Sequence, residues 1–313
     1  MDIQLLIAVL AGTIVSATPL LFSAMGEIIA ELSGMMNLSI EGLMMVGAMS
    51  GYAVSSLTGS LWLGVVAGVL GGAFLALLFG LLTINLRIHQ VVTGLAMGLF
   101  AEGVARFLGR PFIGQALPAM FIPIHLPVLG DVPFVGPIFF NQNVFVYFSY
   151  VLVPVVWYVV YRTKVGLSLR AAGERPRAAE VVGVNVYRVR HVAVMLGGAL
   201  AGLAGAFLSI GWLNGWTEGM TAGRGWIALA LVIVAGWNPG KVILGAYLFG
   251  FTYIMAVQTQ TITGLIGKVP VYLVQMAPYL AAIAFLAVIG RSSLRHRIGS
   301  PTSLTIPYSR EER

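Results

Sequence analysis

The stretch GLMMVGAMSGYAVSSLTGSLWLGVVAGVLGGAFLALLFGLLTINL, residues 42–86, contains no Asp, Glu, Lys or Arg. A second stretch without these residues runs from 132 to 161. Over the whole chain of 313 residues, 58% are hydrophobic and only 9% are charged. Soluble domains carry about 25% charged residues. The composition therefore indicates a protein that crosses a membrane several times.

On both sides of residues 42–86, the chain contains further apolar segments that are about as long as a membrane-spanning helix. A hydrocarbon core of about 30 Å requires roughly 20 apolar residues per helix, and backbone in lipid must satisfy its own hydrogen bonds. We therefore expect an all-α fold that forms one transmembrane domain over residues 1–313. About nine spans are expected, at 3–25, 41–57, 61–84, 91–108, 143–161, 191–211, 225–237, 241–258 and 270–290.

Basic residues set the expected orientation. The polar segment 162–190 holds seven of the eighteen Lys and Arg residues, and the tail 291–313 holds five arginines. Because basic loops stay on the cytoplasmic side, both segments are expected in the cytoplasm, with the N-terminus outside. The segment 109–142 then falls outside. It contains six of the fourteen prolines, which disfavour a regular helix, so we expect an external cap rather than a span.

Two segments resemble each other weakly. SGMMNLSIEGLMMVGAMSG (33–51) and NGWTEGMTAGRGWIALALVIVAG (214–236) each carry a polar, glycine-rich break before a short apolar helix. Glu41-Gly42 aligns with Arg224-Gly225, and the spans before the two motifs run in opposite directions in the expected topology. Paired interrupted helices of an inverted repeat mark a transport pathway in many transporters. Ordinary glycine-mediated helix packing is the alternative.

The chain lacks the motifs that would make it an enzyme. No G-x-x-x-x-G-K-[ST] phosphate loop, H-E-x-x-H or G-x-S-x-G occurs, so we expect no ATP site of the phosphate-loop type and no catalytic residues. There is no cysteine, and the four histidines are scattered, so no metal site is expected either.

A short helix is expected inside the polar segment, from Pro176 to Gly183. Proline is tolerated in the first turn of a helix, and glycine often ends one. Such a helix is too short to be stable alone in water, so packing must hold it. Ala178, Ala179, Val181 and Val182 offer a compact surface for a groove in another protein. A solvated basic loop that serves only topology is the alternative.

The run GLSLRAAGERPRAAEVVGVNVYRVR (166–190) resembles the cytoplasmic loop of ABC-importer permeases of the bacterial branched-chain amino acid, ribose and nucleoside group. In that group a pattern R-x-x-G-x-x-x-x-A-A-x-x-x-G-[IV] contains the helix that docks into the ATPase subunit. The matching residues here are Arg170, Gly173, Ala178, Ala179, Gly183 and Val184, with Pro176 at the start of the helix. NLSIEGLMMVGA (37–48) and GRGWIALALVIVAGWNP (223–239) look like the motifs of the nucleoside and simple-sugar branch.

This resemblance implies an assembly. It comprises ATPase subunits that hold ATP and Mg, a second, homologous permease and an extracytoplasmic binding protein in the bacterial inner membrane. It also implies that residues 162–190 form a coupling loop. Since polar residues inside a membrane usually face a cavity or a partner, we expect the substrate pathway among Asn37, Glu41, Asn214, Trp216, Glu218, Arg224 and Trp226. An ion pair between Glu41 and Arg224 is a further expectation.

The sequence thus predicts an importer permease for nucleosides, with a simple sugar or branched-chain amino acids as alternatives. An ATP-independent secondary transporter is the alternative from another class. It would need coupling carboxylates deep in the spans, for which Glu41 and Glu102 are the obvious candidates. Glu102 lies four residues before Arg106, however, and the two are expected to neutralise each other.

Overall fold

Helices dominate the computed structural model, which describes residues 3–258, 273, 276, 277, 279, 280, 283 and 300–309. The α-helices are α1 (Ile3–Leu32), α2 (Ile40–Thr58), α3 (Leu61–Gly80), α4 (Gln90–Gly109), α5 (Val135–Phe139), α6 (Val144–Arg162), α7 (Lys164–Glu174), α8 (Pro176–Val181), α9 (Val186–Ala206), α10 (Arg224–Val234) and α11 (Pro239–Gln258). Two π-helical turns, η1 (Leu81–Asn85) and η3 (Phe207–Trp212), extend α3 and α9, and a 3₁₀ turn, η2 (Arg110–Phe112), extends α4. The strands β1 (Ile124–His125) and β2 (Asn141–Gln142) pair antiparallel.

Six helices in the described part of the chain are long and apolar enough to cross a membrane. They are α1, α3 with η1, α4 with η2, α6, α9 with η3, and α11. The outer helices α3 and α4 present large apolar side chains outward, such as Phe74 and Leu99, which are 60% and 72% exposed. This pattern suits lipid contact, because a membrane helix needs no polar outer face. The expected all-α membrane fold is confirmed.

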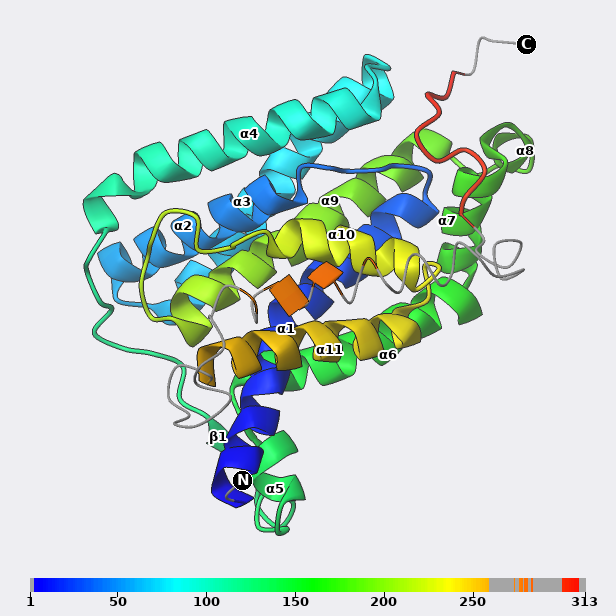
Figure 1. Ribbon diagram of the computed structural model, residues 1–313. Coiled ribbons are helices and arrows are strands. Elements are labelled where there is room, and N and C mark those ends of the chain that lie inside the picture. Colours follow the sequence, from blue (N-terminus) through cyan, green and yellow to red (C-terminus); the bar gives the residue numbers. More distant parts are fainter. Residues whose placement is uncertain are drawn as a thin grey trace.

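The helix α9 lies in the middle of the molecule and packs against α1, α2 and α3 (Figure 1). Close backbone approach requires glycine where α3 crosses α9: a Cβ atom on Gly72 would lie 2.2 Å from the carbonyl oxygen of Gly198. Small residues drive helix association in lipid because they allow such close packing. In the stretch GVLGGAFLA (68–76), the face that carries Gly68 and Gly72 therefore packs against α9. This stretch does not face lipid on all sides.

Three of the nine expected spans, 41–57, 225–237 and 270–290, are not among the six helices named above. The expected span 41–57 is the helix α2. The expected span 225–237 is the eleven-residue helix α10, whose length of about 16 Å at 1.5 Å per residue cannot cross a core of about 30 Å. Polar, irregular chain from 213 to 223 precedes it. The expected span 270–290 lies almost entirely outside the described residues. The total of nine spans therefore remains a prediction.

The proline-rich segment 109–142 contains no spanning helix of its own beyond Phe112, where the span formed by α4 and η2 ends. Its regular structure is limited to η2, α5 and the two short strands. The segment is held at one end of the bundle: Tyr52 on α2 donates a hydrogen bond to the carbonyl of Gln115 at 2.5 Å. Ala116 also forms a backbone bridge to Gly215. The segment thus covers the loop that leads into α10.

Candidate functional site: a polar helix start beside a cavity

The Glu41 side chain joins the two sequence motifs directly. Glu41 lies in the first turn of α2, and its carboxylate reaches the start of α10. Oε1 accepts hydrogen bonds from the backbone N–H of Gly223 at 2.8 Å and from the Thr221 hydroxyl, and Oε2 accepts from the N–H of Gly225 at 2.7 Å. The free N–H groups at a helix start attract negative charge. A carboxylate on one helix therefore fixes the beginning of the other.

Gly225 allows this arrangement because it leaves room for α2. A Cβ atom at this position would lie 2.6 Å from the backbone nitrogen of Glu41. Gly223 before it has a φ of +77°, a left-handed conformation that glycine adopts without strain. The string GRG (223–225) is thus required for the turn and for the close contact at the same time.

The predicted ion pair between Glu41 and Arg224 is wrong. In the described part of the chain, the acid–base contacts are Glu102–Arg106 and His125–Asp131. The Glu41 carboxylate accepts from donors at the start of α10, and the Arg224 guanidinium bonds to backbone carbonyls instead. Arg224 donates from Nη1 to the carbonyls of Met220 and Thr221, at 3.2 and 3.1 Å.

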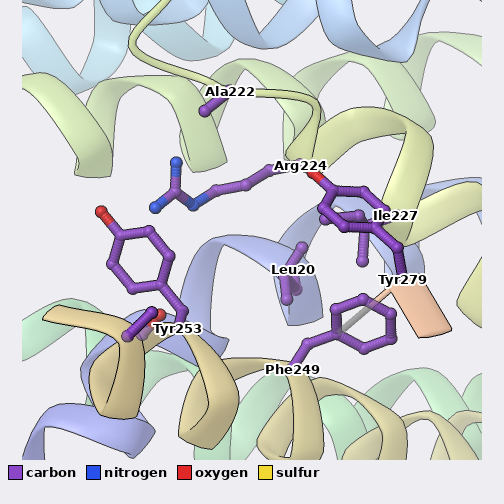
Figure 2. A pocket seen from close by; sticks show the side chains of 9 residues that line it. Leu20, Ala222, Arg224, Ile227, Phe249, Tyr253 and Tyr279 are labelled. Atoms are coloured by element: carbon purple, nitrogen blue, oxygen red, sulfur yellow. The ribbon is translucent and has the colours of Figure 1, made fainter. Parts of the chain in front are cut away.

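Arg224 lines a cavity of about 370 Å³ between α1, α10 and α11. Figure 2 shows its side chain extended above Tyr253, with Phe249 and Tyr279 on the opposite side. The guanidinium carbon lies 4.6 Å from the centre of the Tyr253 ring and 5.5 Å from that of Trp212. Aromatic rings stabilise a cation in this geometry. Arg224 is only 6% exposed, so the cavity contains a buried positive charge flanked by rings.

The other predicted pathway residues do not line this cavity. Asn37 is buried, and its Oδ1 accepts from the backbone N–H of Ser39, which stabilises the turn before α2. Asn214 and Trp216 secure the segment that begins at Gly109: Asn214 donates to the Leu117 carbonyl at 3.5 Å, and the Trp216 ring packs against Gly109. Glu218 and Trp226 are exposed.

Sequence reasoning missed the residues that complete the cavity. Tyr253, Phe249 and Ala256 come from α11, and Ser16 and Leu20 come from α1. All five lie in apolar spans, where a tyrosine or serine does not stand out. No local pattern distinguishes Tyr253 from the other aromatic residues of the helix, because its role depends on the distant Arg224.

Two buried carboxyl groups near the end of α1 were also missed. Glu27 accepts from the backbone N–H of Asn37 at 3.1 Å, and Glu31 accepts from the indole N–H of Trp237. Both glutamates are at most 2% exposed. They attach the end of α1 to the loop before α2 and to the connection between α10 and α11. The break before α2 is thus held from both sides.

The polar segment 162–190 forms a second candidate site. It contains α7 and the six-residue helix α8, with Pro176 in its first turn. Gly183 follows with a φ of +92°. This confirms the short helix expected at 176–183. Val181 and Val182 at its end are 87% and 78% exposed, which leaves an unpaired apolar tip on a polar loop.

The face of α8 differs from the expectation at one residue. Ala178 is exposed, but Ala179 is 3% exposed and packs against Val186 and Tyr308 within the chain. Gly173 is also internal, because a Cβ atom there would lie 2.2 Å from the Leu32 carbonyl. Arg170 stacks over the ring of Tyr161 at 5.5 Å. The outward surface of α8 therefore consists of Arg177, Ala178, Val181 and Val182.

Glu102 and Arg106 form the expected pair on α4, with 2.5 Å between their side-chain atoms. The pair is solvent-accessible, so it contributes at most about 0.5 kcal/mol. We expect Glu102→Gln to change uptake by no more than about two- to threefold, because a free-energy change of about 0.5 kcal/mol corresponds to a factor of roughly 2.3. Initial uptake rates, normalised to the amount of chain in the membrane, check this. Loss of uptake would restore Glu102 as a coupling carboxylate.

Comparison with known proteins identifies the family. The family model described as branched-chain amino acid transport system / permease component matches residues 9–298. The chain therefore belongs to this permease family, and it is embedded in a membrane. No solved structure matches the chain.

Several relatives match over nearly their full length. TsgC13 of Haloferax volcanii, provisionally described as a glucose ABC transporter permease, is 38% identical over 96% of this chain and 97% of its own. The nucleoside permease NupC of Lactococcus lactis is 34% identical over 90% and 91%. The guanosine permease NupQ of Bacillus subtilis is 31% identical over 100% of both chains. With the family match, these relatives identify the chain as an ABC transporter permease.

The same three organisms each contain a second, more distant match. These are TsgB13 at 23% identity, NupB at 20% and NupP at 23%, all named as ABC transporter permeases. In each organism, one permease thus resembles this chain closely and another resembles it weakly.

Proposed function

We propose that the chain is the nucleoside-carrying permease of an ATP-driven importer. Two of the relatives above are named for nucleosides or guanosine. The cavity chemistry supports the same substrate: a buried guanidinium flanked by Tyr253 and Trp212 suits a planar base with carbonyl and ring-nitrogen acceptors. This cavity is the observation in the chain itself that carries the proposal.

A simple sugar is the second candidate. It is favoured by the relatives from Haloferax volcanii, which are described as glucose permeases. Competition for uptake separates the two candidates. The experiment measures the uptake of labelled guanosine by cells whose only importer contains this chain, with an excess of either unlabelled nucleoside or glucose. We expect nucleosides to compete and glucose to have no effect. No uptake of guanosine through this chain, together with uptake of labelled glucose, would replace the nucleoside assignment with the sugar assignment.

The importer is proposed to contain two different permeases. The close and distant matches in each of the three organisms support a heterodimer, with this chain as the closely related member. An extracytoplasmic binding protein would deliver the substrate, as the family resemblance implies. ATP and Mg would be bound by the ATPase subunits, because this sequence has no phosphate loop.

The ATPase is proposed to dock on the outward surface of α8. Val181 and Val182 form an exposed apolar tip, which is the kind of anchor that a groove in a partner buries. This places residues 162–190 and the tail 291–313 in the cytoplasm of a bacterial cell, with the N-terminus outside the inner membrane. The positive-inside rule supports the same orientation.

We further propose an inverted repeat and about nine spans, in which α10 and the chain 213–223 before it together make one crossing. The aligned residues Glu41 and Arg224 lie in the first turns of α2 and α10, and the two helices meet at the Glu41 contact with Gly225. The helices before them, α1 and α9, also pack closely: a Cβ atom on Gly26 would lie 2.7 Å from the Gly197 carbonyl. Contact between equivalent helices supports a pathway at the repeat interface.

Replacing Arg224 tests the proposed pathway. We expect Arg224→Gln to lower nucleoside uptake about tenfold, because a desolvated cation–π contact contributes up to about 2 kcal/mol. Arg224→Lys is expected to fall between this variant and wild type, since lysine keeps the charge without the planar fork. The control is Trp226→Phe on the same helix, which is 44% exposed and does not line the cavity. Wild-type uptake by Arg224→Gln would remove the cavity from the pathway.

A further inference from the structure

Residues 301–309, called the C-terminal strap here, lie against α7 and α8 (Figure 1). We propose that this strap positions α8 for coupling and connects it to the end of α1, with Tyr308 and Arg190 as the positioning residues. The proposal rests on the coupling role of α8 proposed above. It assigns a function to a tail that is separated from α8 by more than a hundred residues of chain.

The first half of the strap is fastened to the end of α7. The backbone N–H of Ser303 donates to the Gly173 carbonyl at 2.9 Å, and the Ser303 hydroxyl donates to the same oxygen. Thr302 bonds to Glu174 through its hydroxyl, with 3.0 Å to Oε2. These contacts use the last two residues of α7. The strap therefore binds to the C-terminal end of α7, which immediately precedes α8.

The second half of the strap lies beneath α8. Tyr308 is 9% exposed and packs in a small apolar cluster with Ala172, Ala179 and Val186. Its hydroxyl donates to Oε2 of Glu180 on α8, and its ring centre lies 5.7 Å from that of Tyr187 on α9. This explains why Ala179 is buried. One ring fills the space between α8 and the start of α9.

Arg190 connects this cluster to the membrane-spanning part of the chain. The side chain is 2% exposed. It donates from Nε to the Ser33 carbonyl just after α1 at 3.1 Å, and from Nη2 to the Ala172 carbonyl at 3.4 Å and the Ser303 hydroxyl at 3.2 Å. The guanidinium carbon also lies 5.9 Å from the centre of the Tyr308 ring. One buried cation thus joins α1, α7 and the strap.

The strap provides the packing that a helix as short as α8 needs to be stable. Isolated helices of fewer than about 12 residues are marginal in water, and α8 has six. Without support, a push from the ATPase on Val181 and Val182 would distort α8 instead of moving α7 and α1. With Tyr308 and Arg190 in place, α8 and the end of α1 move as one body. The break before α2, which begins at Ser33, receives that movement.

The test measures transport per ATP hydrolysed in vesicles that contain the full importer. Tyr308→Ala is expected to lower this ratio at least about fivefold, the lower end of typical coupling between sites. Tyr308→Phe keeps the ring and loses the hydroxyl that bonds to Glu180, so a smaller loss is expected. The control is Ile306→Ala, an exposed residue of the same strap, with an unchanged ratio. A wild-type ratio for Tyr308→Ala would overturn the proposal, as would a loss confined to Ile306→Ala.

A cross-link gives a second test that does not depend on a cavity-forming variant. The chain has no cysteine, so Glu174→Cys combined with Thr302→Cys introduces a single possible disulfide within the chain. If strap and α7 move as one body, oxidation should leave transport within about twofold of the reduced protein. Transport that oxidation abolishes and a reductant restores would show that the strap must detach, which contradicts the proposal.

The two proposals fail in different ways. If α8 does not dock the ATPase, charged residues at Val181 and Val182 leave ATPase binding intact. If docking is correct and the strap has no positioning role, those variants lose ATPase binding, while Tyr308→Ala keeps a normal transport-to-ATP ratio. ATPase retention on the purified permease is measured alongside the ratio, so each result is assigned to one proposal.

Discussion

Replacing Val181 and Val182 together with aspartate is expected to abolish nucleoside uptake while the chain still inserts in the membrane. Both side chains are largely exposed, at 87% and 78%, so a charge at these positions meets solvent rather than the core of the described part of the chain. In the proposed complex they enter a groove of the ATPase, where two carboxylates would lose their hydration. Loss of an interface anchor costs at least about 2 kcal/mol, or roughly a thirtyfold loss of affinity.

Co-purification of the ATPase with the tagged permease measures this effect directly. Arg188→Gln is the matched control, because it lies in the same polar segment, is exposed and has no place in the apolar tip of α8. The control should retain the ATPase and normal uptake. Undiminished ATPase binding by the double aspartate variant would show that α8 is not the docking helix.

Glu41→Ala is expected to cause the second large effect. The substitution removes the acceptor for the Thr221 hydroxyl and for the N–H groups of Gly223 and Gly225. Hydrogen bonds to a charged group contribute about 1.5–3 kcal/mol each when buried. Glu41 is only partly buried, so we expect a loss of stability of about 2 kcal/mol in total. The start of α10 would shift, and Arg224 in its first turn would shift with it.

Thermal unfolding of the detergent-purified chain and uptake by cells measure the two consequences. The melting temperature should fall by several degrees, at about 2–4 °C per kcal/mol for a larger domain, and uptake should fall by more than tenfold. Glu218→Ala, at an exposed position of the same loop, serves as the control and should change neither. Wild-type melting and uptake for Glu41→Ala would mean that the contact between α2 and α10 has no role in the pathway.

Much of the fold follows from local sequence. Uncharged apolar stretches predict helices in lipid, and most expected spans coincide with observed helices. The short helix α8 was predicted from Pro176 and Gly183, because proline in a first turn and glycine after a last turn fix the local backbone conformation. The segment 225–237 was wrongly predicted to be a full span. Hydropathy counts apolar residues, but it does not show that α10 is only eleven residues long and follows a polar loop.

The site was less predictable, because its contacts join residues far apart in sequence. Arg224 was expected in the pathway, but its partners Trp212 and Tyr253 depend on the packing of η3 and α11. The assumed Glu41–Arg224 pair followed charge alone, whereas the helix start offers better-placed donors. Ala179 was assigned to the outer face of α8, and only the strap with Tyr308 determines that it is buried.

Reconstitution tests the central claim most directly. Vesicles are prepared with this chain, its partner permease, the ATPase and the binding protein, and matched vesicles omit the ATPase. Labelled guanosine uptake is then followed with and without ATP. We predict uptake that requires both the ATPase and ATP hydrolysis and that is lost in the Val181→Asp, Val182→Asp variant. Guanosine accumulation by this chain without any ATPase would contradict the assignment and establish a secondary transporter instead.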